Sequence, residues 1–249
     1  MLSTLFEMAK PRTPPPALPP QPWQRAPQRQ GTRRRDPLTQ DAIVEKALEV
    51  LDAEGLDGLS MRRLAEQFDT GPASLYWHVG SKDGLLDLLL DRVIGEIEVP
   101  DPDPQRWREQ LKEVAHTIRA TILRHRDIVR ISIGRIPMGP NALRHSESVL
   151  AIMRAGGVPD RLAVLGHHLL LAAINGFTMD ETGEPPADQP SLEEGAKMAR
   201  DYLAALPPDH FPNLVALADQ YAIIDPEVRF DLMVDLFVEG LARRVEAGG

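Results

Sequence analysis

From residue 39 onward, apolar residues recur every three or four positions along the chain, which is the spacing of one face of an α-helix. The first such face comprises Ile43, Ala47, Leu48 and Leu51. No stretch alternates apolar and polar residues for long enough to predict a β-strand. The pattern therefore predicts an all-α fold in which a few short helices precede a larger helical bundle.

Capping residues, prolines and glycines divide this pattern into separate helices. The short helices are predicted over 39–55, from 60 past Leu64 and Phe68, over 72–78, and from 81 to about 97. The bundle helices are predicted over 104 to about 125, 127 to about 135, about 140–155 and 159 to about 179. Ser191 with Glu194 forms a capping box that opens a further helix, and Asp225-Pro226 opens the last one.

Residues 1–36 differ in composition from the rest of the chain. Nine of the 23 prolines precede residue 38, and the segment ends close to the basic run Arg33-Arg34-Arg35. Few of its residues are large and apolar, so we predict a disordered Pro/Arg-rich arm. The basic run would either enter a minor groove of DNA or remain a solvated tail, and the sequence leaves both open.

Charge is distributed unevenly along the 249 residues. The net charge of −9 argues against a general polyanion binder. Residues 1–40 nevertheless hold seven basic and two acidic residues, so the remainder is strongly acidic. The chain has no cysteine, which excludes thiolate metal sites, catalytic thiols and disulfides. No apolar run approaches the roughly 18 residues of a membrane span, so we expect a cytoplasmic protein.

Three short helices with a tight turn at 69–71 are typical of a helix-turn-helix DNA-binding domain. Tyr76, Trp77 and His78 are consecutive, so they cannot all face the core of the domain. Leu75 and Val79 are the expected inward residues. Aromatic, hydroxyl and imidazole groups on the outer face of such a helix contact phosphates and base edges.

The runs 59–65 (LSMRRLA) and 74–79 (SLYWHV), together with Lys82, closely resemble the DNA-binding domain of the tetracycline-repressor (TetR) family. Trp107, Leu111, Gly134 and Pro137 extend a weaker resemblance into the C-terminal half. The resemblance implies a three-helix DNA-binding domain over 37–84 and an α-helical ligand-binding and dimerisation bundle over 85–249. The helix from about 81 links the two.

The resemblance also implies a function. We expect a ligand-responsive homodimer that pairs through helices 159–179 and 226–246. It would act as a repressor, released from double-stranded operator DNA by a small, largely apolar effector. In a bacterial cell such a protein is cytoplasmic and lies on the nucleoid when bound to DNA.

By position, Arg62 and Ser74 correspond to residues that read base edges in this family. The expected groove and phosphate contacts are Tyr76, Trp77, His78, Ser81 and Lys82. Ala73 is included in the interface, but the segment 71–73 lacks the amide side chain that reads a base in the family prototype. We therefore expect a different operator sequence.

The ligand cavity is assigned in the same way. Its expected lining is Val114, Ile118, Ile131, Ser132, Met138 and Phe177. In the tetracycline repressor a histidine, an asparagine, a glutamine and a carboxylate hold a magnesium–drug chelate. Ser132, Val114, Ser148 and Asn175 align with them, and none matches. We expect an effector that binds without metal, and no cofactor.

Two other functions remain open from the residues alone. Glu113 and His116 share a helix face, as in carboxylate metal bundles, although the chain has no second copy of this motif. His167 and His168 point about 100° apart on a helix and cannot easily share a metal. The alternatives are thus a metalloenzyme and a scaffold that retains the helix-turn-helix without binding DNA. We favour the regulator, with no catalytic residue and no metal site.

Overall fold

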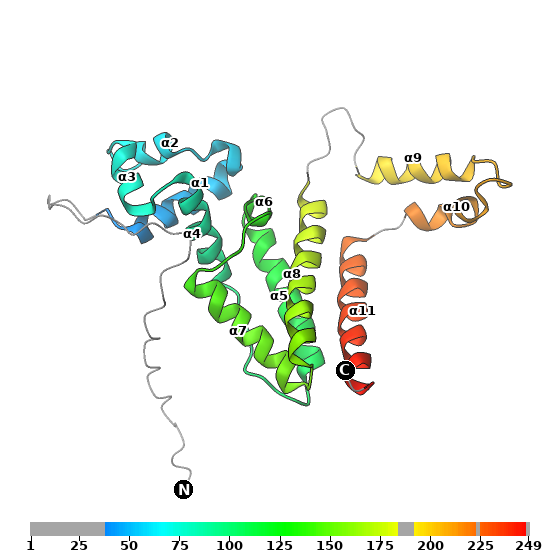
Figure 1. Cartoon of the computed structure of the whole chain (residues 1–249). Coiled ribbons are helices and arrows are strands. Elements are labelled where there is room, and N and C mark those ends of the chain that lie inside the picture. Colours follow the sequence, from blue (N-terminus) through cyan, green and yellow to red (C-terminus); the bar gives the residue numbers. More distant parts are fainter. Residues whose placement is uncertain (1–37, 184–191, 223–224, 248–249) are drawn as a thin grey trace, which may run out of the picture.

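The computed structural model of the chain describes residues 38–183, 192–222 and 225–247. Every regular element in these ranges is a helix, as Figure 1 shows, so the predicted all-α fold is confirmed. The predicted arm of residues 1–36 lies outside the described residues. Ser191, the predicted cap of the helix that follows, also lies outside them.

The chain folds into an N-terminal domain and a C-terminal body. The N-terminal helices are α1 (Gln40–Gly58), α2 (Met61–Glu66), α3 (Pro72–Val79) and α4 (Lys82–Ile94). The body contains α5 (Trp107–Arg124), α6 (Ile128–Ser132), α7 (Pro140–Ala155), α8 (Asp160–Thr182) and α11 (Pro226–Glu246). Between α8 and α11 come α9 (Leu192–Ala204), α10 (Pro212–Ala216) and the 3-10 helix η1 (Ala218–Ala222). Figure 1 shows α1–α3 at one end of the molecule and α9–α10 projecting at the other.

Short polar side chains begin four of these helices, as the sequence predicts. Thr39 accepts a hydrogen bond from the backbone N–H of Ala42 at 3.1 Å. The Ser60 and Ser81 hydroxyl oxygens and the Asp225 carboxylate do the same for α2, α4 and α11. Each cap satisfies a backbone donor that the first turn of a helix leaves without a partner, which is worth about 1 kcal/mol.

Several predicted helix boundaries are wrong. The helix predicted to run past Phe68 ends at Glu66, and the helix predicted to reach about residue 97 ends at Ile94. The helix predicted from residue 104 begins at Trp107, because residues 104–106 form a turn in which the Arg106 N–H bonds to the Asp103 carbonyl at 3.1 Å. The helix predicted to reach about residue 135 ends at Ser132, since Ile133 is extended and Gly134 has a φ of 74°. At Gly55 the φ of 76° interrupts α1 where the sequence predicts its end.

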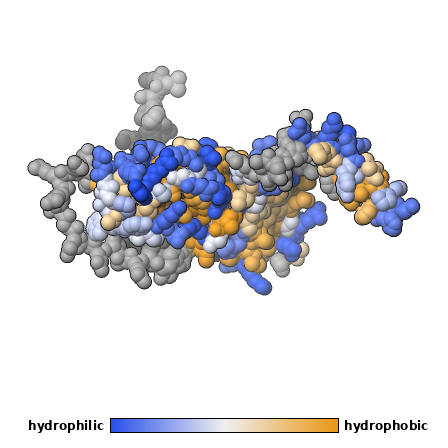
Figure 2. All heavy atoms as spheres, turned by 90° about the horizontal axis from the view of Figure 1, so that it is seen from above, coloured by the Kyte–Doolittle hydropathy of each residue, from blue (hydrophilic) through white to orange (hydrophobic). Residues whose placement is uncertain are grey.

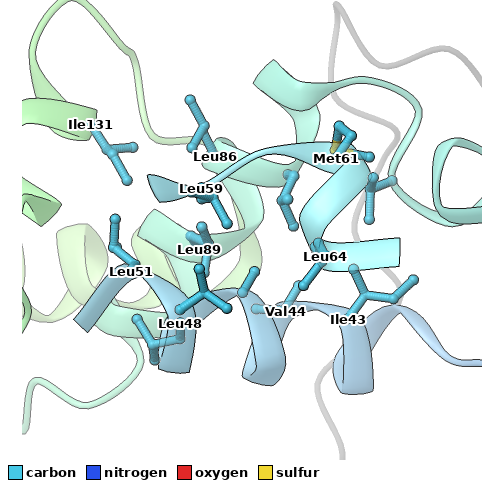
Figure 3. Close-up of a cluster of buried hydrophobic side chains, with 14 of the residues drawn as sticks. Ile43, Val44, Leu48, Leu51, Leu59, Met61, Leu64, Leu86, Leu89 and Ile131 are labelled. Carbon is cyan, nitrogen blue, oxygen red and sulfur yellow. The ribbon is translucent and has the colours of Figure 1, made fainter. Parts of the chain in front are cut away.

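The N-terminal core is formed by α1, α2, α3 and α4, with Ile128 and Ile131 of α6 packed into it. Figure 3 shows Ile131 beside Leu86 and Leu89 of α4. Helix α4 therefore belongs to this core along much of its length, and α6 joins the core from the C-terminal half. The second core lies among α5, α7, α8 and α11 and is centred on residues such as Leu111, Ile152 and Phe230.

Helix α8 has a mean hydropathy of 1.5 over 18 residues, so by length and composition it could cross a membrane. No run of this kind was expected from the sequence. Its inward residues, such as Leu170 and Ile174, are buried in the C-terminal core. Its outward residues, such as Leu165 and Leu169, are exposed. A helix that is apolar on two faces is expected where one face packs on its own subunit and the other meets a partner.

Candidate DNA interface and ligand-binding core

Helix α3 presents a polar and aromatic surface above a closed core. Leu75 is fully buried and Val79 is buried, which confirms both as the inward residues. On the other side Tyr76 and Trp77 are 43% and 46% exposed, and Ser74 is exposed beside them. Ala73 is also exposed. This surface is available for contacts outside the chain, because the core beneath it is complete.

Backbone geometry fixes the corner between α3 and α4. Gly80 has a φ of 73°, a conformation that residues with a side chain rarely adopt. A Cβ atom on Gly84 would lie 2.3 Å from the Val79 carbonyl oxygen, so only glycine permits this approach. The tight corner brings Lys82, at the start of α4, beside the C-terminal end of α3.

Two residues for which the sequence predicted no role hold α3, the helix predicted to contact DNA, in place. The Gln40 side-chain amide donates a hydrogen bond to the His78 carbonyl at 3.0 Å, which ties α1 to the end of α3. The Thr70 hydroxyl donates to the Ser74 hydroxyl at 2.9 Å, which orients a predicted base reader. The second contact could have been found from the sequence, because a threonine in the turn immediately before a helix often bonds to a neighbouring polar group.

Arg62 and Lys82 are exposed cations that precede and follow α3 in the chain. The Arg62 side chain is 87% exposed, and its Nε atom lies 3.4 Å from Glu66, a surface pair that contributes little to stability. Lys82 forms no ion pair with another described residue. The Ser81 oxygen caps α4, which leaves its hydroxyl hydrogen as a donor to a phosphate.

The other cations of this domain are held by neighbouring carboxylates. Arg63 donates to Glu54 at 2.6 Å, and Lys46 pairs with Glu49. Arg92 lies 2.6 Å from Glu45, at the far end of α4. Positive charge available to phosphates is therefore concentrated at Arg62 and Lys82, although the domain as a whole is acidic.

His78 lies in the interface as a neutral group. Its ring meets the Trp77 ring edge to face, with centroids 4.6 Å apart. Burial lowers the pKa of His78 below its ordinary value, because the protonated ring would lose hydration there. At neutral pH this imidazole can donate or accept a hydrogen bond but adds no charge.

The residues predicted to line a ligand cavity are divided among three places. Val114 and Ile118 are buried in the C-terminal core, and Phe177 packs against it. Ile131 instead lies in the N-terminal core, and Ser132 donates its hydroxyl to the Val129 carbonyl at 2.7 Å. Met138 lines a cavity of about 550 Å³ between α1, α4 and residues 136–141. Their role in ligand binding stays a prediction.

The segment between α5 and α7 contacts both the first and the last helix of the N-terminal domain, α1 and α4. The Asp127 carboxylate accepts a hydrogen bond from the Leu56 N–H at 2.8 Å, at the end of α1. Arg135 donates to Asp83 and Asp87 of α4 at 2.8 and 2.7 Å. These pairs place a cation from the C-terminal half next to the end of α4 that carries Lys82.

A buried carboxylate on α4 forms the N-terminal cap of α7. The two Asp91 oxygens accept hydrogen bonds from the backbone N–H groups of Ala142 at 2.9 Å and Asn141 at 3.3 Å. A Cβ atom on Gly139 would lie 2.1 Å from this carboxylate, so glycine is required at the approach. His125 adds a bridge between α1 and the end of α4, with Asp52 and Glu96 each 3.1 Å away.

Helices α8 and α11 expose apolar residues on the side that faces away from their core. The exposed residues are Val164, Leu165, Leu169 and Met179 of α8 and Val228, Leu232 and Leu236 of α11. Figure 2 shows apolar residues gathered over the middle of the molecule. The three on α11 recur every four residues, which makes one continuous stripe. The two helices predicted to pair with a second copy thus carry the apolar face that such pairing needs.

The histidines considered for a metal site have other surroundings. His116 lies 3.4 Å from Asp231 and its ring contacts Phe230 edge to face. The described residues include no cluster of three or more histidine and carboxylate groups placed to hold an ion.

An exposed reading helix on a closed three-helix domain, joined through α4 to a bundle with an apolar pairing face, defines a helix-turn-helix transcriptional regulator. Residues 43–89 match the model of the bacterial regulatory proteins of the tetR family. Residues 99–245 match that of the tetracyclin repressor-like C-terminal domain. The chain belongs to the TetR family, whose members bind operator DNA as dimers and respond to small molecules.

Individual relatives agree with this membership. An HTH-type transcriptional regulator of Saccharopolyspora erythraea is 34% identical over 214 residues, which are 85% of this chain and 87% of the relative. The HTH-type transcriptional repressor DrrR1 of Streptomyces coeruleorubidus is 43% identical over 124 residues, 49% of this chain and 46% of DrrR1.

Solved structures of ActR from Streptomyces coelicolor are also similar. Apo ActR is 42% identical, with a TM-score of 0.81 and coverage of 87% of this chain and 100% of ActR. ActR in complex with actinorhodin is 44% identical, with a TM-score of 0.78 and coverage of 84% and 99%.

Proposed function

We propose that the dimer is a repressor that holds two α3 helices in successive major grooves of an operator and leaves the DNA when a small, largely apolar effector binds. The observation that carries the proposal is the outer surface of α3, where Ser74, Tyr76 and Trp77 are exposed beside Lys82. A relative named as a repressor and a similar structure with a bound small molecule support it.

The side chains divide the work of recognition by their chemistry. Arg62 and Ser74 reach base edges, and Ala73 contacts a thymine methyl group. Tyr76, Trp77, His78, Ser81 and Lys82 contact phosphates and the walls of the groove. Because few cations of the domain over residues 38–95 are available, its affinity for DNA of arbitrary sequence is weak and discrimination depends on the α3 surface.

Effector binding changes the position of α4 through the contacts that hold it. Arg135 donates hydrogen bonds to the end of α4 near Lys82, and Asp91 joins the other half of α4 to α7. An effector that favours a different arrangement of α6 and α7 therefore moves the two N-terminal domains, so that their α3 helices no longer fit successive major grooves. The extent of release is set by the difference in effector affinity between the two arrangements.

The effector site belongs to the C-terminal half, with Val114, Ile118 and Phe177 as apolar lining and Met138, Ile131 and Ser132 toward the N-terminal domain. It requires no metal ion and performs no chemical reaction. We infer a cytoplasmic protein on the same grounds, since its target is chromosomal DNA.

The test begins with selection of bound fragments from random-sequence DNA, followed by gel shift with the enriched fragment. Tyr76→Ala and Lys82→Ala are expected to weaken binding, while Lys46→Ala, which removes a lysine of α1 that pairs with Glu49, is not. Equal binding by all three variants would exclude this mode of DNA recognition. Addition of actinorhodin or other small molecules to the complex then tests release.

A further inference from the structure

The cavity of about 550 Å³ between α1, α4 and residues 136–141 has a lining that is partly apolar. Val44 of α1 and Leu88 of α4 contribute to it from the two helices. Ile136 and Pro137 add an exposed apolar edge, and Ile136 is 71% exposed. A chain segment that lay in the cavity would remove this apolar surface from water.

The charge of this cavity is negative. Its lining residues carry four carboxylates and one guanidinium, on Asp41, Glu45, Asp87, Asp91 and Arg92. The Arg92 guanidinium is already paired with Glu45 at 2.6 Å and with Glu96 at 2.8 Å. Asp41, in the exposed first turn of α1, forms no ion pair with another described residue. The cavity therefore attracts a cationic occupant and repels the phosphates of DNA.

The arm of residues 1–36 carries the complementary charge and joins the described chain beside this cavity. It holds seven basic and two acidic residues, and 33–35 is the only run of three consecutive basic residues in the sequence. Gln40 lines the cavity and follows Arg33 by seven residues, a connection that spans at most about 25 Å when extended. The Gln40 side chain also bonds to the His78 carbonyl at 3.0 Å, so the start of α1 lies beside α3 as well. The basic run can thus reach the cavity or DNA bound to α3, but not both at once.

We propose that the cavity is a docking site for the arm of its own chain. In the DNA-free protein the run 33–35 lies against the carboxylates of α1 and α4, and the residues that flank the run pack on Ile136 and Pro137. DNA and the cavity then compete for the run, so the free protein keeps this cluster of positive charge away from phosphates. The docking itself goes beyond the proposed function and does not depend on it.

Cross-linking tests the docking in the full-length protein. Because the chain has no cysteine, Thr32→Cys beside the basic run and Ile136→Cys on the apolar edge provide a unique pair of thiols. A short bismaleimide is expected to join them within one chain. The control carries the same two cysteines together with Arg33→Gln, Arg34→Gln and Arg35→Gln. Its cross-linking should be slower by about fivefold or more, because an undocked arm meets residue 136 only at the effective concentration of a tethered chain.

A single carboxylate and added DNA sharpen the test. Asp41→Asn should slow cross-linking about two- to fivefold, the loss of one exposed ion pair. Asp57→Asn, at the other end of α1 and with a side chain that is 90% exposed, is the matched control and should leave the rate unchanged. Duplex DNA of arbitrary sequence should also slow cross-linking, because its phosphates bind the basic run in place of the cavity.

Equal rates for the chain with its arginines and the chain with three glutamines would overturn the docking and leave the cavity to another occupant. A product of doubled mass on a denaturing gel would mean that the arm docks on a second copy, which overturns docking within one chain. A rate that DNA leaves unchanged overturns the competition. Circular dichroism of each variant identifies a protein that fails to fold. None of these measurements needs an operator, so their outcome is separate from that of the proposed function.

Discussion

The N-terminal domain and the C-terminal body are both helical, but they bury their apolar residues to different degrees. In residues 38–95 the large hydrophobic side chains left exposed are Tyr76 and Trp77, both on α3. In the body, α8 and α11 together expose seven such residues on one face. The first core is complete within one chain, so its exposed aromatic groups serve recognition. The second core is also closed within one chain, but it leaves an apolar face of α8 and α11 outside it that is covered only when two chains pair.

The largest effect is expected from a charge on the pairing face. Leu232→Glu places a carboxylate in the α8–α11 interface, where it would lose hydration without gaining a partner. The dimer should dissociate, and operator affinity should fall by about 100-fold or more because the two heads no longer bind together. Sedimentation and gel shift measure both changes. Leu123→Glu, on an exposed leucine of α5, is the matched control and should remain dimeric. A dimeric Leu232→Glu variant would place the interface elsewhere.

The next largest effect is expected from exposed residues of α3 and from Lys82, whose removal should lower operator affinity without lowering the stability of the fold. Tyr76→Ala and Ser74→Ala should each weaken operator binding by about 1–3 kcal/mol, while thermal stability changes little because both side chains are exposed. Lys82→Ala should weaken binding to all sequences alike and lower the slope of log affinity against log salt by about one, because one phosphate is no longer neutralised. Fluorescence anisotropy over a range of salt concentrations gives both quantities. A loss of stability equal to the loss of binding would mark these residues as structural.

How much of the structure could be predicted from the sequence depends on whether a feature is set by local or by long-range contacts. Helix positions, the caps at Thr39, Ser60 and Ser81, and the outward face of α3 follow from local rules, so they were predictable. The hydrogen bonds of Asp91, Asp127 and Arg135 join residues about 50 to 70 positions apart, and no local pattern announces them. The placement of Ile131 in the N-terminal core was missed for the same reason, because α6 packs against helices that precede it by more than 30 residues.

Acid is expected to weaken the body through His145, one of its buried histidines. The pKa of His145 is about 4 in the folded chain and about 6.5 when unfolded, so the unfolded state binds more protons between these values. Stability therefore falls as the pH drops below 6.5, by about 1 kcal/mol from this residue at pH 5.5. Denaturant unfolding at pH 7.5 and 5.5 measures it. His145→Phe should reduce the pH dependence, whereas His168→Phe, on an exposed ring, should not. Equal slopes for both variants would contradict the burial of His145 as its cause.

The smallest effect concerns communication between the two regions. Arg135→Gln removes both ion pairs to α4 from a partly exposed position, so folding should be preserved. Operator affinity should change little, but the effector concentration needed for release should rise about three- to fivefold as coupling weakens. Release titrations of the wild-type and variant complexes measure this. Arg154→Gln, which removes an exposed pair with Asp160, is the control. An unchanged release curve would show that Arg135 does not transmit the effector signal.

The most direct test of DNA recognition by a paired α3 surface is the motif that the protein selects from random-sequence DNA. The wild-type dimer is expected to enrich an inverted repeat whose half-sites lie about 34–36 Å apart, one turn of the double helix. A Tyr76→Ala, Lys82→Ala double variant should fail to enrich it while remaining folded and dimeric. Enrichment of the same motif by that variant, or of no symmetric motif by the wild-type protein, would contradict recognition by this surface.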